Sequence, residues 1–168
     1  MRVVSRAEAD ELLKGWGSPL LNDGFSVLRQ TPPTIFLPVD TGRKAALARY
    51  LTYEVLGARA AVLEVFDEDV FEHVENTHLF NRWRSGLGES RELHEAPCHV
   101  VEEADELDTS ALLALAMYFV WSVAVFTENA DVMFLISHDE YLAVLCPDES
   151  RLREITLDLQ VFAEQRHA

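Results

Sequence analysis

The residues best placed for acid–base chemistry are His138, Asp139 and Glu140, which follow one another in FLISHDEYLAVL, residues 134–145. A histidine beside a carboxylate can act as a general base, with the acid orienting the imidazole ring. A nucleophilic triad also needs a serine or cysteine within hydrogen-bond reach of that ring. Ser137 precedes the histidine, but it lacks the flanking glycines of a nucleophile elbow.

A structural interpretation of the same residues competes with the chemical one. Apolar runs on both sides of 138–140 are typical of strands, so the polar residues would form the turn between them. Alternatively, Ser137 and Glu140 have the spacing of a capping box and would start a short helical turn. We favour a turn or a cap, and we keep a functional His138–Asp139 pair as the alternative.

Two ExxH patterns, Glu75 to His78 and Glu164 to His167, raise the question of a metal site. An acid and a histidine at this spacing share a helix face, as in di-iron helix bundles. The second pattern ends one residue before the C-terminus, where helices fray, and the apolar residues of the chain favour strands over four long helices. HExxH and paired CxxC motifs are absent from the sequence. We therefore expect no metal and no other cofactor.

The segment DTGRK, residues 40–44, lies between a predicted strand and a predicted helix. Free N–H groups at a helix start, together with Arg43 and Lys44, could hold a phosphate. The full phosphate-loop pattern is absent. We therefore predict that Asp40 or Thr41 caps the helix instead.

The two cysteines do not form a disulfide framework and are compatible with a reducing compartment. Cys146 precedes a predicted helix, where a thiolate can be stabilised, but the acids that follow it in CPDESR oppose this. We predict a buried structural cysteine. Cys98 and His99 are neighbours on a predicted strand, so their side chains point to opposite faces and do not form a catalytic pair.

The formal net charge of −15 repels nucleic acid phosphates and anionic lipids, so we expect neither nucleic acid nor membrane binding. A basic protein partner fits this charge. Most acidic runs are solvated loops, but the densest run could also form a docking surface for such a partner. Its members are Glu102, Glu103, Asp105, Glu106 and Asp108.

One cluster combines arginine with an aromatic residue, in NRWR, residues 81–84, with Arg91 nearby. Such a cluster can stack on a nucleic acid base. A single patch in a strongly acidic chain does not favour that use. We expect the arginines of this cluster, Arg82, Arg84 and Arg91, to pair with acids of the chain or to meet an acidic ligand.

The chain has 168 residues, 49% of them hydrophobic, which fits one domain over 1–168 that needs no metal or disulfide to fold. Apolar spacing, caps and glycines predict helices over 6–14, 40–56, 67–85, 110–119 and 148–163. Ser5 and Glu8 have the spacing of a capping box before the first of these helices, and residues 108–110 are predicted caps of the fourth. Runs of β-branched and aromatic residues predict strands over 25–29, 34–39, 58–66, 98–101, 121–126, 132–136 and 141–146.

The predicted fold is therefore α+β, with a mainly antiparallel sheet packed against helices and a three-stranded C-terminal meander. The N-terminus lacks a secretory signal and the longest apolar run is too short to span a membrane, so we expect a cytoplasmic protein. The excess of arginine over lysine suggests a bacterial source.

Our leading functional hypothesis is a non-enzymatic, acidic interaction protein, such as an immunity-type inhibitor of a basic toxin nuclease. The alternative is a small enzyme or ligand-binding domain with a site near His138, Asp139, Arg82 and Arg84. A homodimer through a strand edge or the apolar face of residues 152–162 is a further option.

Overall fold

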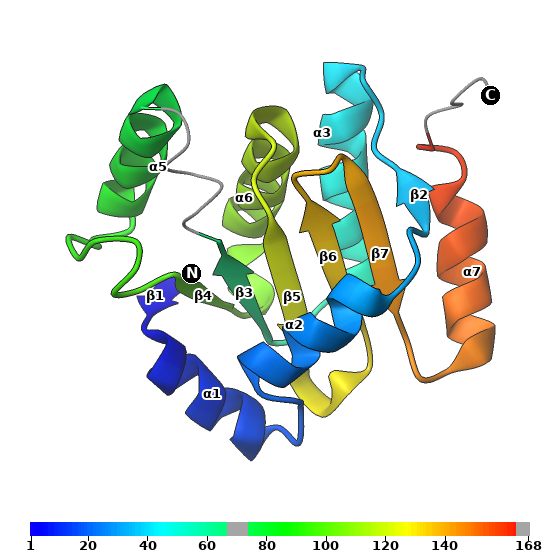
Figure 1. The fold of residues 1–168 in the computed structure, drawn as a ribbon, viewed down its shortest axis with the longest axis horizontal. Coiled ribbons are helices and arrows are strands. Elements are labelled where there is room, and N and C mark those ends of the chain that lie inside the picture. Colours follow the sequence, from blue (N-terminus) through cyan, green and yellow to red (C-terminus); the bar gives the residue numbers. More distant parts are fainter. Residues whose placement is uncertain (67–73, 164–168) are drawn as a thin grey trace.

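Seven strands form one sheet in the computed structural model, which describes residues 1–66 and 74–163 (Figure 1). They are β1 (Arg2–Val4), β2 (Ile35–Phe36), β3 (Ala61–Val65), β4 (Cys98–Val101), β5 (Val123–Thr127), β6 (Met133–Ser137) and β7 (Tyr141–Leu145). The spatial order is β1-β4-β3-β5-β6-β7-β2, and every neighbouring pair is antiparallel. The predicted α+β class is confirmed, and the predicted meander, β5-β6-β7, is part of a wider sheet.

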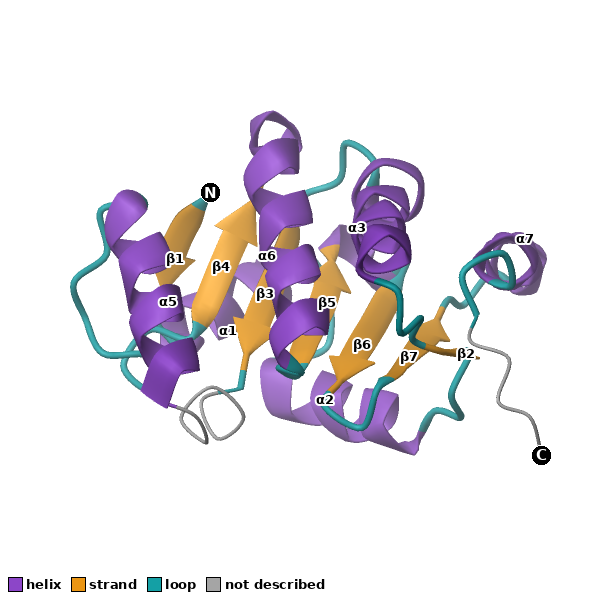
Figure 2. Cartoon of the chain, turned by 90° about the horizontal axis from the view of Figure 1, so that it is seen from above, coloured by secondary structure: helices purple, strands orange, loops and turns teal. Residues whose placement is uncertain are grey.

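Six α-helices of the described residues flank this sheet (Figure 2). On one face lie α1 (Arg6–Gly15) and α2 (Leu21–Gln30), and on the other lie α3 (Thr41–Tyr50), α5 (Val74–Gly86) and α6 (Glu106–Phe119). The last helix, α7 (Glu149–Leu159), lies beside α3, where the Tyr50 hydroxyl donates to Asp158 over 3.0 Å. The chain continues from α3 through a π-helical turn, Leu51–Leu56.

The central strands are buried on both faces because helices cover both. Every residue of β3, β5 and β6 is buried. Alternate residues enter opposite layers, so Val125 packs under α3 and α6 whereas Ala124 and Phe126 pack under α1 and α2. Burial of this apolar surface is the main force that holds the layers together.

The largest correction to the sequence prediction concerns α2. We expected a strand over residues 25–29 after a loop, but Leu21–Gln30 is a helix. Leu21, Gly24 and Leu28 recur at helical spacing and are buried against the sheet. A Cβ at Gly24 would collide with the ring of Phe126, so only glycine allows the helix to approach this closely.

Other elements also differ from the prediction. The strand expected over 34–39 shrinks to β2 at the sheet edge, where Pro38 follows it and offers no N–H for further pairing. The helix expected over 110–119 begins at Glu106, so the residues predicted as its caps lie within it. Acidic residues in its first turn suit the positive end of the helix dipole. Strand β1 was not predicted.

Two local predictions, the cap before the first helix and the apolar face of the last one, are confirmed. Ser5 and Glu8 form a capping box at the start of α1. On α7, Ile155 and Leu159 are buried in the core, so the predicted apolar stripe packs against its own sheet. Among the described residues, no helix combines the length and the apolar character required to cross a membrane.

Candidate functional site

A polar cavity of about 540 Å³ lies between α2 and one end of the sheet, and we call it the α2 cavity. The sheet and its flanks contribute Glu64, Phe66, Ser122, Leu135, Ser137 and Tyr141. The helices contribute Arg6 from α1 and Asn22, Phe25 and Arg29 from α2. The turn between β6 and β7 contributes His138 and Asp139.

The alternation of side chains along the strands explains why these residues meet. Val62 lies in the layer under α1 and α2, so Glu64, two residues further along β3, points to the same face. Glu64 is paired in register with Ala124 of β5, two residues after Ser122. The antiparallel pairing thus brings the end of β3 and the start of β5 to one edge of the cavity.

Glu64 is the deepest charged group of the site. Its side chain is 4% exposed, and its Oε1 lies 2.5 Å from Nε of Arg6, whose side chain is 50% exposed. A buried carboxylate requires such a partner because removal of a charge from water is costly. The pair links the first turn of α1 to the sheet and leaves a charged wall inside the cavity.

Ser122 and His138 form a second polar contact in the same cavity. The Oγ of Ser122 lies 3.0 Å from Nδ1 of His138 and accepts a hydrogen bond from the His138 backbone N–H over 3.1 Å. On the other side of the ring, Nε2 lies 3.6 Å from Oδ1 of Asp139. A hydroxyl, an imidazole and a carboxylate therefore follow one another along the wall.

Helix α2 adds an aromatic wall and a cation. The rings of Phe25 and Phe66 pack with centroids 4.3 Å apart. The guanidinium of Arg29 lies 6.0 Å from the centroid of the Phe25 ring. These side chains reach the cavity because residues 25–29 are helical and not extended as predicted.

The structure places the predicted site residues unequally. His138 and Asp139 line the α2 cavity, whereas Glu140 does not appear in its lining and completes the turn with a φ of 59°. Residues 138–140 form the predicted turn between β6 and β7. Arg82 is exposed on α5 and Arg84 is buried on the same helix, and neither lines the cavity.

Sequence reasoning missed Glu64, Ser122, Arg6 and Arg29. Glu64 could have been found from the sequence, since it is the one charged residue in the apolar run AAVLEVF. A charged residue is rarely buried unless it is paired, so its position in a predicted strand indicates a partner or a site. No comparable signal marks Ser122, which comes close to His138 only when β5 pairs with β6.

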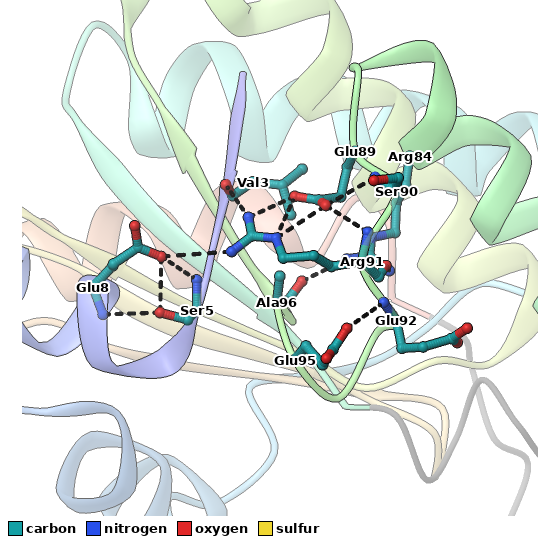
Figure 3. Close-up of polar contacts among 10 residues, drawn as sticks. All are labelled: Val3, Ser5, Glu8, Arg84, Glu89, Ser90, Arg91, Glu92, Glu95 and Ala96. Atoms are coloured by element: carbon teal, nitrogen blue, oxygen red, sulfur yellow. Dashed lines mark hydrogen bonds and ion pairs between the residues drawn. The ribbon is translucent and has the colours of Figure 1, made fainter.

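The arginine cluster on and after α5 stabilises a loop (Figure 3). Arg84 is 1% exposed and donates to the carbonyls of Arg91 and Ala96 over 3.0 and 2.9 Å. Arg91 forms an ion pair with Glu89 at 2.6 Å, and its hydrogen bonds lower the pKa of that carboxyl to about 2. The predicted pairing with acids of the chain is thus confirmed for Arg91, whereas Arg84 binds backbone carbonyls instead.

The acidic run lies at the start of α6. Asp105 binds the N-terminal amine and accepts a hydrogen bond from the backbone N–H of Glu102 over 3.0 Å. Burial by itself raises the pKa of Asp105, but the two hydrogen bonds and the positive charge of the amine together lower it below its usual value. Glu106 and Asp108 lie in the first helical turn, and the side chain of Glu103 falls outside the described part of the chain. Part of the acidic charge therefore has a structural role.

The junction at residues 40–44 has the predicted cap. Asp40 accepts from the backbone N–H of Arg43 over 2.8 Å. The Arg43 side chain donates to carbonyls after α7, and the Lys44 ammonium donates to the Met117 carbonyl over 2.8 Å. Arg43 thereby links α3 to the segment after α7, and Lys44 links α3 to α6.

Cys146 and Cys98 are both buried and unbridged. Within residues 1–66 and 74–163, no three His, Cys, Asp or Glu side chains come together in a way that could hold a metal ion. The ExxH pattern at 164–167 and the side chain of Glu75 lie outside the described residues.

His99 is buried on the face opposite Cys98, as the strand alternation predicted. Its ring packs 5.9 Å from that of Phe80 and 5.4 Å from that of Trp83. Neither ring nitrogen has a hydrogen-bond partner among the described residues. Burial, and next the positive charge of Arg84, lower the pKa of His99 from 6.5 to about 3. The imidazole is therefore neutral in the fold.

We predict that Arg6→Met lowers the free energy of unfolding by about 1–3 kcal/mol, because the buried carboxylate of Glu64 loses its ion pair with Arg6. This is less than a fully buried pair would lose, since Arg6 is half exposed. Urea denaturation of Arg6→Met, Glu64→Leu and the double variant measures the coupling. The double variant should be more stable than the sum of the single effects predicts. Additive effects would contradict a coupled pair.

We predict that the His99→Leu variant loses less stability than the unchanged protein when the pH falls. The folded pKa of His99 lies below its unfolded value, so its neutral form stabilises the fold above pH 6.5, and this contribution falls as the pH drops from 6.5 toward about 3. Melting temperatures across this range should fall less steeply in His99→Leu than in the unchanged protein. The exposed His94→Gln control should retain the original slope, and equal slopes in all three would contradict the assignment.

Comparison with known proteins finds no relative of this chain. No protein-family model matches it, and neither a curated protein nor a solved structure matches it. Support for a function therefore comes from the geometry of the α2 cavity and from the charge of the surface.

Proposed function

We propose that this protein binds a small polar molecule in the α2 cavity. The observation that carries the proposal is the buried carboxylate of Glu64, which meets Arg6 at the wall of a 540 Å³ cavity. Small-molecule sites are typically cavities of roughly 300–1,000 Å³ in which a few polar groups converge. The Ser122–His138 pair adds further hydrogen-bonding groups to the same space.

The charges of the lining indicate which molecules fit. Arg6 and Arg29 supply two positive charges and Glu64 and Asp139 supply two negative ones, so the lining is formally neutral when His138 is uncharged. A neutral or zwitterionic ligand suits such a wall better than a polyanion. The rings of Phe25 and Phe66 offer apolar area next to the polar groups.

We predict that Asn22→Trp abolishes ligand binding, because the indole occupies the cavity from the exposed side of α2. Val27→Trp is the matched control: Val27 is exposed on another side of the same helix and does not line the cavity. A library of neutral and zwitterionic metabolites would be screened by ligand-observed NMR. The proposal is wrong if no compound binds, or if binding survives Asn22→Trp.

A second candidate function is docking of a basic protein on the acidic run. The observation that favours it is Leu107, which is 75% exposed between Glu106 and Asp108. An apolar residue surrounded by charges of one sign is a suitable anchor for a partner of the opposite sign. In this proposal the protein is an immunity-type inhibitor of the bacterial cytoplasm that covers a basic nuclease.

We predict for this second candidate that Glu102→Gln, Glu106→Gln, Asp108→Asn and Leu107→Ala together weaken binding to a small basic nuclease domain. At low salt the variant should bind the nuclease domain more weakly than the unchanged protein does. Its affinity should also decrease less steeply as the salt concentration rises. The matched control neutralises other exposed acids and an exposed leucine, with Glu11→Gln, Asp23→Asn, Glu149→Gln and Leu157→Ala. Titration calorimetry at several salt concentrations distinguishes the two sets, and equal effects would show that only net charge matters.

A further inference from the structure

We propose that Ser122 is a nucleophile and His138 its general base, and that the α2 cavity transfers the acyl group of a small carboxylic ester to water. This inference rests on the proposed small-molecule binding in that cavity and adds a reaction to it. It differs from the His138 site expected from the sequence, because the hydroxyl comes from another strand.

The hydroxyl and the imidazole are within reach of each other. Ser122 Oγ lies 3.0 Å from His138 Nδ1, and the His138 backbone N–H also donates to this oxygen over 3.1 Å. The serine is 6% exposed, so little bulk water competes for it, yet it forms part of the cavity lining. A nucleophile within hydrogen-bond distance of a base is the arrangement required for covalent catalysis.

Asp139 fits the role of a positioning residue. When Ser122 donates its proton to Nδ1, the ring proton of His138 resides on Nε2, and this nitrogen lies 3.6 Å from the Asp139 carboxylate. A carboxylate on this side favours the imidazolium that forms when the ring takes the serine proton. A nucleophilic triad has the same order of hydroxyl, imidazole and carboxylate, but there the serine contacts Nε2 and the acid contacts Nδ1. Here the serine contacts Nδ1 and the carboxylate lies near Nε2.

Both turns that carry these residues contain a non-glycine residue in the left-handed region. Val120, two residues before Ser122, has a φ of 59°, and Glu140, two residues after His138, also has a φ of 59°. Such a conformation is unfavourable for a β-branched residue and persists only when the surrounding structure holds it. Strained turns of this kind gather at functional sites.

The proposed reaction balances without a cofactor. Ser122 Oγ forms a bond to the ester carbonyl carbon while its proton moves to Nδ1 of His138. The C–O bond to the leaving group breaks, and the alcohol departs with that proton. Water then attacks the acyl-serine and gives a proton to His138, which returns it to Ser122 Oγ as the acid is released. Side chains of Arg6 and Asn22 bring N–H donors to the cavity for the negative charge of the intermediate.

The first test is labelling with diisopropyl fluorophosphate, in which Ser122 Oγ displaces fluoride from phosphorus. Intact-mass spectrometry should show one adduct, and peptide mapping should place it on Ser122. Ser122→Ala should lose the adduct and His138→Gln should slow its formation at least tenfold, whereas the exposed Ser26→Ala should label at the original rate. An adduct on Ser137, or none at all, overturns the proposal.

The second test is p-nitrophenyl acetate hydrolysis as a function of pH. The rate should increase with pH in the unchanged protein, and His138→Gln should flatten this increase. Asp139→Asn should reduce the rate, and Asp139→Glu should restore most of it. Circular dichroism verifies that each variant is folded. In the conservative variant Ser122→Cys, iodoacetamide should selectively alkylate the new thiol at position 122. A profile that neither His138→Gln nor Asp139→Asn changes would overturn the assignment.

The outcomes separate this inference from the function on which it rests. If metabolites bind and Asn22→Trp abolishes binding, but no Ser122 adduct forms, the acyl transfer is wrong and the binding function stands. In that case the Ser122–His138 contact only fastens the turn between β6 and β7 to the start of β5. If neither binding nor labelling is observed, both proposals fail.

Discussion

The sheet is covered on both faces, and this constraint determines how the protein can place polar groups. All residues of β3, β5 and β6 are buried, so a charge on any of these strands must be compensated inside the protein. Glu64 is such a charge, and Arg6 compensates it from the first turn of α1. The first helix is therefore fastened to the sheet by an ion pair as well as by apolar contact, and the wall of the α2 cavity is charged.

The position of α2 follows from a second packing constraint. Gly24 brings the helix backbone against Phe126, where any side chain would collide with the ring. The helix therefore lies close to the middle of the sheet, while its polar residues Asn22 and Arg29 reach the cavity beyond the apolar contact. The same helix covers the core and supplies the site, which explains how a short chain can provide both.

Other buried polar groups of the protein have a structural role that is easier to recognise. Arg84 holds the loop after α5 through two carbonyls, and Lys44 joins α3 to the end of α6. His99 is buried among aromatic rings and is neutral in the fold. None of the three lines the α2 cavity. Glu64, Ser122 and Ser137 differ from these three because each is buried and still faces a space large enough for a ligand.

The sequence by itself determined the α+β class, the cap of α1, the helix that follows Asp40, the meander of β5 to β7 and the turn at His138, because these depend on local spacing and turn chemistry. Only the tertiary structure decided that residues 21–30 are helical and that Ser122 lies beside His138. A helix pressed onto a sheet through one glycine and a contact between neighbouring strands both arise from non-local packing. Leu21, Gly24 and Leu28 do have helical spacing, but one of the three is a glycine, so the apolar pattern of this helix is incomplete in the sequence. No spacing within one segment records which strands pair, so the contact between Ser122 and His138 became visible only when the strands were paired.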